Sequence, residues 1–332
     1  MTDTAESFIP LGKTAIQVSP LGIGAWAWGD KLFWAYGRSA AAGGGFTDDD
    51  IHQAFNASLD AGVNFFDTAE VYGSGRSERL LGGFLPAAGR PVVVATKFMP
   101  LPWRLTKGAM LRALRGSLKR LGLEQVDLYQ VHWPTPPVSI ETWADALADI
   151  VQAGLARSVG VSNYNESQMR RAYSVLARRG VPLASNQVEY HLLNRKVELN
   201  GLLQACQELG ITLIAYSPLA QGALTGKYSA ERPLPGVRGR RYNRAYLEKT
   251  QPLLQLMREI GRTRSAPASS GSPAVNGPTP AQVALNWLIC KGTLPIPGAK
   301  TARQALDNCG ALGWRLTPEE VAALDQASLD LQ

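Results

Sequence analysis

The sequence predicts a (β/α)8 barrel, the TIM barrel fold, preceded by a β-hairpin and forming one domain over residues 1–332. Two observations carry the prediction. Segments with helical periodicity alternate with short apolar runs, as in repeated strand and helix units. Six of those runs end in a polar residue, at intervals of 25 to 35 residues, which is the length of one strand and one helix: Asp67, Lys97, His132, Ser162, Gln187 and Ser217.

The first elements precede this repeat. Residues 8–20, FIPLGKTAIQVSP, have the pattern of a hairpin with its turn at Gly12 and Lys13. Residues 21–26, LGIGAW, are expected to form the first barrel strand, and LPIP at 294–297 the eighth. Barrels of this kind often exceed about 250 residues in one domain, so the chain length is compatible with the fold.

The intervening helices are predicted from apolar residues that recur on one face. Ile51, Phe55 and Leu59 have this spacing, and a glycine that can cap a helix follows at Gly62. An open doubly wound sheet is the alternative architecture. We favour the closed barrel, because polar residues follow every strand, whereas an open sheet gathers its ligand groups at one switch point.

Residues 265–279, SAPASSGSPAVNGPT, interrupt the repeat. Twelve of these 15 residues are Ser, Ala, Pro or Gly, so we expect a flexible insertion. It ends at Thr279 and Pro280, a helix N-cap followed by proline in the first turn. Thr317 and Pro318 repeat this arrangement with a capping-box glutamate, Glu320.

Composition excludes several classes of function. Charged residues make up 18% and hydrophobic residues 45% of the chain, as in globular proteins, and the net charge of +7 is spread without a basic and aromatic cluster. We therefore expect no nucleic-acid partner, although an anionic small ligand fits the charge. The N-terminus has no secretory pattern, no run of 18 apolar residues occurs, and the three cysteines have no metal-binding spacing. We expect a cytoplasmic protein without a membrane or metal partner.

Barrel geometry should bring Asp67, Lys97 and His132 to one mouth, with Tyr72 on the loop after the second strand. Singly, such residues are often caps, core aromatics or solvated charges. Together they have a specific chemistry, because Lys97 would lower the pKa of the Tyr72 phenol and Asp67 would hold the lysine charged. His132 would orient a carbonyl oxygen or share in the proton transfer.

This group lacks a source of electrons, so a bound cofactor would have to provide a hydride. The stretch from Gly22 to Ala27 matches the glycine pattern of a dinucleotide-binding loop, but we do not expect a helix after it. Gly73-Ser74-Gly75 does precede an expected helix, but it lacks the lysine and hydroxyl pair of a P-loop. Neither stretch predicts a nucleotide site.

The sequence resembles the aldo/keto reductases over nearly its whole length. The motifs that carry the resemblance appear in that family's order: FFDTAEVYGSGRSERLLG, ATKF, LYQVHWP, VGVSNY, NQVEYHLLNR, YSPLAQGALTGKY and IPGAKT. The resemblance implies a catalytic tetrad of Asp67, Tyr72, Lys97 and His132, with Tyr72 as the general acid in carbonyl reduction. It also implies NADPH, bound without a Rossmann fold, and a small-molecule carbonyl substrate.

The resemblance implies further contacts with the cofactor. The groups expected to bind the nicotinamide are Ser162, Asn163, Gln187 and Tyr216. Those expected along the pyrophosphate are Ser217, Leu219, Gln221, Gly222 and Leu224. Those expected at the adenosine phosphate are Gly298, Ala299, Lys300, Gln304 and Asn308, with Arg303 or Lys227 as alternatives to Lys300. An aromatic substrate wall could be formed by residues that could equally be packing residues: Trp26, Trp34, Phe98, Trp103 and Trp133.

Two other functions are open at this level. Lys97 at a strand end could form a Schiff base, as in an aldolase. Alternatively, the chain could be a nucleotide-sensing module, since it also resembles the β subunits of potassium channels. The physiological substrate, the direction of the reaction and the oligomeric state do not follow from the sequence.

Overall fold

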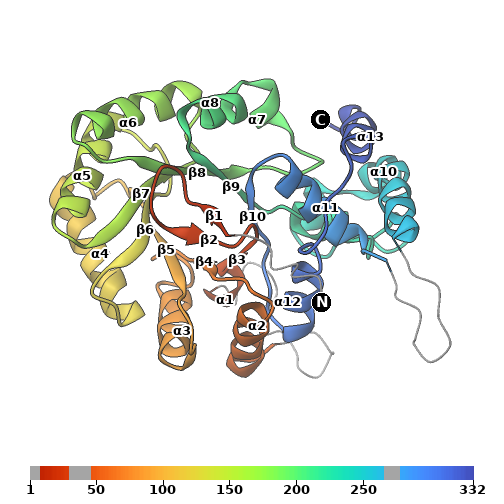
Figure 1. Ribbon diagram of the computed structural model, residues 1–332, viewed down its shortest axis with the longest axis horizontal. Coiled ribbons are helices and arrows are strands. Elements are labelled where there is room, and N and C mark those ends of the chain that lie inside the picture. The colour runs from red at the N-terminus through yellow and green to blue at the C-terminus, as the bar shows by residue number, and fades with distance from the viewer. Residues whose placement is uncertain (1–7, 30–45, 265–276) are drawn as a thin grey trace.

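The computed structural model describes residues 8–29, 46–264 and 277–332 (Figure 1). Eight parallel strands form one sheet in sequence order, and helices surround it. The strands are β3 (Gly22–Gly24), β4 (Phe65–Asp67), β5 (Val93–Phe98), β6 (Val126–Val131), β7 (Ala156–Ser162), β8 (Leu183–Glu189), β9 (Thr212–Tyr216) and β10 (Leu294–Ile296). The predicted barrel is confirmed, and each of the six predicted polar residues lies within two residues of the end of its strand.

The sheet curls until its first and last strands meet. The backbone N–H of Gly24, in β3, donates a hydrogen bond of 3.0 Å to the carbonyl of Pro297, which follows β10. A side chain at Gly24 would place its Cβ 2.9 Å from the Ile296 carbonyl, so glycine permits this close approach. The closure excludes the open doubly wound sheet.

A hairpin of β1 (Ile9–Pro10) and β2 (Gln17–Val18) covers one end of the barrel. Leu11 is buried with the interior side chains of the strands, and the backbone N–H of Gly12 donates a 2.7 Å hydrogen bond to Thr212 at the start of β9. The hairpin therefore plugs the barrel at the N-terminal ends of the strands. The opposite end, where the polar residues follow the strands, is left for a site.

The outer layer consists of helices with one buried face. Ile51, Phe55 and Leu59 are buried in α2, as predicted. The helices of the first half are α1 (Trp26–Gly29), α2 (Asp48–Asp60), α3 (Arg76–Phe84), the 3-10 helix η2 (Leu85–Ala87), α4 (Lys107–Leu121), α5 (Ile140–Gln152) and α6 (Glu166–Arg178). Those of the second half are α7 (Lys196–Leu199), α8 (Leu202–Leu209), the 3-10 helix η3 (Ala220–Thr225), α9 (Arg238–Arg241), α10 (Arg244–Thr263), α11 (Pro280–Cys290), α12 (Ala302–Cys309) and α13 (Pro318–Leu329).

Helix signals in the sequence are confirmed at two N-termini and missed at one. Thr279 and Thr317 cap α11 and α13, each with a complete capping box. The expectation that no helix follows the glycine pattern at Gly22 is wrong, because α1 forms one turn there. Most of the expected insertion, residues 265–276, lies outside the described residues. In the described part of the chain, no helix is long and apolar enough to cross a lipid bilayer.

Candidate active site

The centre of the site is a buried ion pair between Lys97 on β5 and Asp67 at the end of β4. Both side chains are almost fully buried, and the Lys97 ammonium donates to a carboxylate oxygen of Asp67. Its other two hydrogen bonds go to the Thr68 carbonyl at 2.9 Å and to the Tyr72 hydroxyl at 3.2 Å. An ammonium has three N–H groups, so this lysine is fully satisfied and one of its bonds is committed to Tyr72.

Tyr72 lies on the loop between β4 and α3, and that loop packs directly on α1. A Cβ on Gly29 would lie 2.3 Å from the Tyr72 carbonyl carbon, and one on Gly73 would lie 1.9 Å from the Gly29 carbonyl oxygen. Gly73 also has a φ of +58°. Only glycine at both positions allows this contact. The Tyr72 ring meets the ring of His132 edge to face, with centroids 5.7 Å apart.

The environment decides the charge of each group. Burial raises the pKa of Tyr72, and although Lys97 lowers it as predicted, burial outweighs this effect, so the net pKa is raised and the phenol keeps its proton. Burial lowers the pKa of Lys97, but attraction by Asp67 and Tyr72 outweighs it, so that pKa is raised and the ammonium stays charged. Burial and repulsion by Lys97 lower the pKa of His132 to about 3, so the imidazole is neutral at physiological pH.

Polar contacts buried behind the loop fix α3, which begins four residues after Tyr72. Ser77 accepts a 2.8 Å hydrogen bond from Thr68 and donates one of 2.8 Å to the Ala25 carbonyl. Glu78 accepts a 2.6 Å hydrogen bond from Thr96 and pairs with Arg120 on α4. Sequence reasoning missed Ser77 and Glu78, because at the start of a helix they have the pattern of ordinary first-turn residues.

The four residues expected at the nicotinamide lie together beside the tetrad. Ser162 donates a 2.8 Å hydrogen bond to the Gln187 carbonyl, and Asn163 donates one of 3.0 Å to the His132 carbonyl. Tyr216 donates to the Asn163 side-chain oxygen at 3.0 Å. The Gln187 side chain donates to Asp67 at 2.8 Å, which leaves its amide oxygen and its second N–H for another partner.

The five residues expected along the pyrophosphate lie on the turn after β9 and in η3. The backbone there has a positive φ angle at Gly222 and also at Ser217, Ala220 and Gln221, where it is unusual because these residues have a side chain. Arg238, on α9, donates a 3.2 Å hydrogen bond to the Gln221 carbonyl and so ties α9 to this turn. The positions concerned are Ser217, Leu219, Gln221, Gly222 and Leu224.

The residues expected at the adenosine phosphate lie on the loop after β10 and on α12, where positive charge gathers. Lys300 is half-buried, and burial followed by repulsion from Arg238 and Lys227 lowers its pKa to about 8. Asn308 donates a 3.2 Å hydrogen bond to the Gly298 carbonyl, and Gln304 accepts one of 2.9 Å from the Lys300 backbone. The Trp28 indole N–H donates a 2.7 Å hydrogen bond to the Ala299 carbonyl. Such a gathering of cations fits a bound phosphate.

The expected aromatic wall is only partly assembled. Trp26 and Trp133 are 39% and 45% exposed, and Trp26 lies beside Tyr72 with ring centroids 6.3 Å apart. Trp103 is 74% exposed on the loop after β5. The structure does not bring Phe98 to this surface: it is fully buried and packs edge to face on Trp143 of α5, at 5.1 Å.

Trp34 lies outside the described residues. Among the described members of the wall, the Trp26 ring lies beside Tyr72, and Trp133 directly follows His132 in the chain. Phe98 could have been excluded from the sequence, because successive side chains of a strand point to opposite faces and Lys97 takes the inner one.

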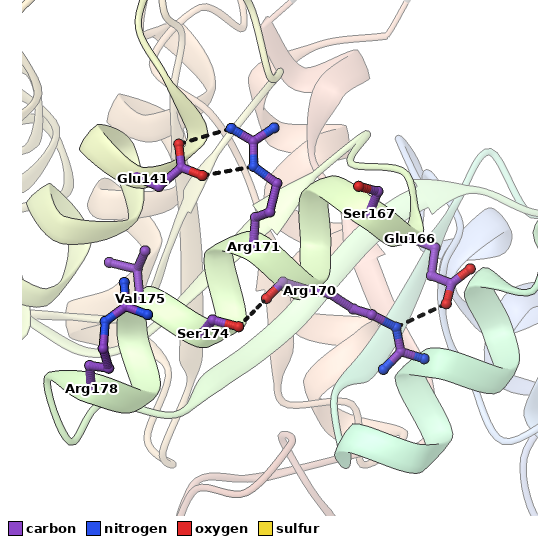
Figure 2. Close-up of a pocket in the computed structure, with 8 residues that line it drawn as sticks. All are labelled: Glu141, Glu166, Ser167, Arg170, Arg171, Ser174, Val175 and Arg178. Atoms are coloured by element: carbon purple, nitrogen blue, oxygen red, sulfur yellow. Dashed lines mark hydrogen bonds and ion pairs between the residues drawn. The ribbon is translucent and has the colours of Figure 1, made fainter.

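A hollow of about 580 Å³ lies elsewhere, on the outer surface of α6 (Figure 2). Its charged groups mostly pair with one another: Arg171 binds Glu141, and Arg170 binds Glu166 and also Glu208 on α8. Paired surface charges of this kind do not form a catalytic centre.

Comparison with known proteins agrees with this geometry. The family model described as Aldo/keto reductase family matches residues 20–329. The pyridoxal reductase of Arabidopsis thaliana chloroplasts is 44% identical, with 94% of this chain and 84% of the relative covered. The structure resembles the glycerol dehydrogenase of Gluconobacter oxydans, with a TM-score of 0.80, 26% identity and coverage of 97% and 94%.

It also resembles an aldo/keto reductase of Klebsiella pneumoniae in complex with NADP and acetate, with a TM-score of 0.71, 28% identity and coverage of 96% and 95%. The family model spans most of the chain, the sequence relative covers nearly all of it, and the solved structures share its barrel. The chain belongs to the aldo/keto reductase family and is an oxidoreductase.

Proposed function

We propose that the protein reduces an aldehyde or ketone to the alcohol with NADPH, and that Tyr72 donates the proton to the carbonyl oxygen. The observation that carries the proposal is the commitment of Lys97 to Asp67, Thr68 and Tyr72. This places a fixed cation against a phenol that is protonated and reaches the surface of the site. A phenol is a weak acid in this setting until its conjugate base is stabilised.

The chain's own residues supply the proton and stabilise the negative charge that its loss leaves on Tyr72. As Tyr72 gives up its proton, the phenolate forms 3.2 Å from the Lys97 ammonium, so the charge that develops has a partner already in position. His132 is neutral, and its buried Nδ1 has no hydrogen-bond partner among the described residues. A neutral imidazole can orient a carbonyl without competing as an acid.

Three groups of residues fit a nicotinamide cofactor, which when bound supplies the hydride. Ser162, Asn163 and Gln187 would hold the carboxamide beside the tetrad, and Tyr216 would lie against the ring. The backbone from Ser217 to Leu224 would lie along the pyrophosphate. Lys300, with Arg238 nearby, would receive the 2′-phosphate of NADPH. The Klebsiella relative in complex with NADP supports this choice of cofactor.

The structure disfavours the Schiff-base alternative. An amine must be neutral to attack a carbonyl, but the pKa of Lys97 is raised and all three of its N–H groups are engaged. The nucleotide-sensing alternative differs from the proposal only in turnover, so an assay must distinguish them.

For the substrate we propose an aromatic aldehyde, with pyridoxal as the first compound to test. The Arabidopsis relative is named for pyridoxal reduction and is 44% identical over 94% of this chain. Trp26 is exposed beside Tyr72, Trp133 is exposed and follows His132 in the chain, and the flat faces of both indoles suit a planar ring.

The test is a panel of pyridoxal, other aromatic aldehydes, aliphatic aldehydes and ketones, assayed by loss of reduced-cofactor absorbance with NADPH and with NADH. The expected result is turnover with NADPH and conversion of pyridoxal to its primary alcohol, identified by chromatography. Tight NADPH binding without turnover of any carbonyl would favour the nucleotide-sensing module. Turnover of aliphatic substrates alone would reject the aromatic substrate class.

A further inference from the structure

We propose that Gln130 is a positioning residue that, with Gln187, holds Asp67 in the orientation that anchors Lys97. This inference rests on the proposed function. Gln130 lies on β6, two residues before His132, and its side chain is fully buried. Its amide N–H donates to Oδ2 of Asp67 at 3.2 Å.

The carboxylate of Asp67 is held at both oxygens. Oδ1 accepts from the Lys97 ammonium, and Oδ2 accepts from Gln187 at 2.8 Å and from Gln130 at 3.2 Å. The two amides come from β8 and β6 and meet at the same oxygen. The carboxylate therefore cannot rotate about its Cβ–Cγ bond without breaking both contacts, and the Lys97 ammonium stays in reach of Tyr72.

The orientation of the Gln130 amide is itself fixed. Ser185 on β8 donates a 3.3 Å hydrogen bond to the Gln130 side-chain oxygen, which leaves the N–H side facing Asp67. Strand pairing places Lys97, Gln130, Gly160 and Ser185 side by side across four strands. A Cβ on Gly160 would lie 2.2 Å from the Ser185 hydroxyl and 3.1 Å from Cγ of Gln130.

Gly160 therefore leaves the space in which the Gln130 amide and the Ser185 hydroxyl meet inside the barrel. The charged groups around position 130 are Asp67 and Lys97, on β4 and β5, and the groups from β7 and β8 are Gly160, Ser185 and Gln187, which carry no charge. The Gln130 amide contacts Asp67 and would touch neither the substrate carbonyl nor the hydroxyl proton of Tyr72. Its role is thus one of position rather than chemistry.

Two substitutions separate positioning from packing. Gln130→Met keeps the length of the side chain but cannot donate, so kcat should fall about 10-fold, the lower limit for a lost hydrogen bond to a charged group. Gln130→Glu restores a donor only while it is protonated. Burial and the neighbouring Asp67 should raise the pKa of that carboxyl above its usual value. The activity of Gln130→Glu relative to the unchanged protein should therefore be highest at low pH and fall as pH rises.

The measurement is kcat with a substrate found in the carbonyl panel, from about pH 5 to pH 8, together with the melting temperature of each variant. Gln125→Met is the matched control, since Gln125 lies just before β6 at the opposite end of the barrel and is exposed. Its activity should equal that of the unchanged protein. The kcat of Gln130→Glu should exceed that of Gln130→Met at low pH, and at high pH it should approach or fall below that of Gln130→Met.

Equal activity of Gln130→Glu and Gln130→Met at every pH would overturn the proposal, because packing alone would then explain any loss. Unchanged activity of Gln130→Met would overturn it as well. If Gln130→Met does not fold, the pH dependence of the ratio for Gln130→Glu decides. Failure of the proposed function would appear separately, as absence of carbonyl reduction by the unchanged protein.

Discussion

The charge state of His132 is set by burial and by its distance from Lys97, and this has a consequence for stability. The pKa of His132 is lowered to about 3, against 6.5 in an unfolded chain. Between these values the unfolded chain binds a proton that the folded protein excludes. The contribution of His132 to the free energy of unfolding should therefore be fully present above pH 6.5 and be lost as pH decreases toward 3.

His132→Asn should remove this part of the pH dependence. The measurement is the free energy of unfolding by urea titration at about pH 7.5 and at about pH 5. We expect its loss between the two pH values to be smaller in the variant than in the unchanged protein, by up to about 2 kcal/mol. The buried His191, whose pKa is lowered by burial, is present in both proteins and cancels in the comparison. An equal pH dependence in both would contradict the neutral, buried state of His132.

Lys300 should decide between the two nicotinamide cofactors. A charge-assisted hydrogen bond to the 2′-phosphate is worth roughly 1.5 to 3 kcal/mol, so Lys300→Ala should weaken NADPH about 10- to 150-fold and leave NADH almost unchanged. Titration by protein fluorescence quenching with both cofactors gives the two affinities. Arg303→Ala tests the alternative phosphate ligand on the same segment, since Arg303 is exposed on α12, and a selective loss of NADPH affinity in that variant would move the phosphate contact from Lys300 to Arg303. An equal change for NADPH and NADH would remove Lys300 from the phosphate site.

At the scale of elements, α3 holds the loop that carries Tyr72, and Glu78 is its main anchor. This carboxylate is fully buried between Thr96 of β5 and Arg120 of α4. Glu78→Gln leaves the partly buried Arg120 without its ion pair, so we expect a loss of about 1 to 3 kcal/mol in the free energy of unfolding. The loop should loosen as well, so kcat should fall.

Urea unfolding and steady-state kinetics test this prediction. Glu248→Gln serves as the control, because Glu248 is an exposed residue of α10 whose change should cost less than about 0.5 kcal/mol. If Glu78→Gln lost stability at the level of this control, the helix would not be anchored through its carboxylate.

Elements were more predictable than contacts between them. The alternation of apolar runs and amphipathic segments placed most strands and helices, because both periods are local properties of the chain. The short turn α1 was missed because one turn has no period to detect. Gln130 was missed because its partner, Asp67, lies 63 residues away, and only the register of the strands inside the barrel brings the two together.

At the scale of the whole molecule, closure of the barrel assembles the site. The polar residues at the strand ends converge because the sheet closes between β3 and β10 and because the hairpin occupies the other end. The sequence could predict this convergence from the fold class. It could not predict the net pKa shift of Tyr72, which depends on how deeply the closed barrel and its loops bury the phenol.

Positive charge is also organised at this scale. The sequence alone suggested an even spread, but residues 227–249 carry seven basic and two acidic side chains. This segment includes Lys227 and Arg238, both close enough to Lys300 to lower its pKa. Two cations of this segment thus lie near the place where the cofactor's phosphates are proposed to bind, which would favour the approach of an anionic cofactor.

The most direct test of the account is Tyr72→Phe, because it removes the one hydroxyl that Lys97 holds and leaves the ring in place. If reduction is limited by chemistry, kcat should fall at least about 100-fold, while the affinity for NADPH should stay nearly unchanged. A single-turnover measurement of NADPH oxidation, mixed with a saturating carbonyl substrate, reports the chemical step without product release. A rate close to that of the unchanged protein would contradict the assignment of Tyr72 as the general acid.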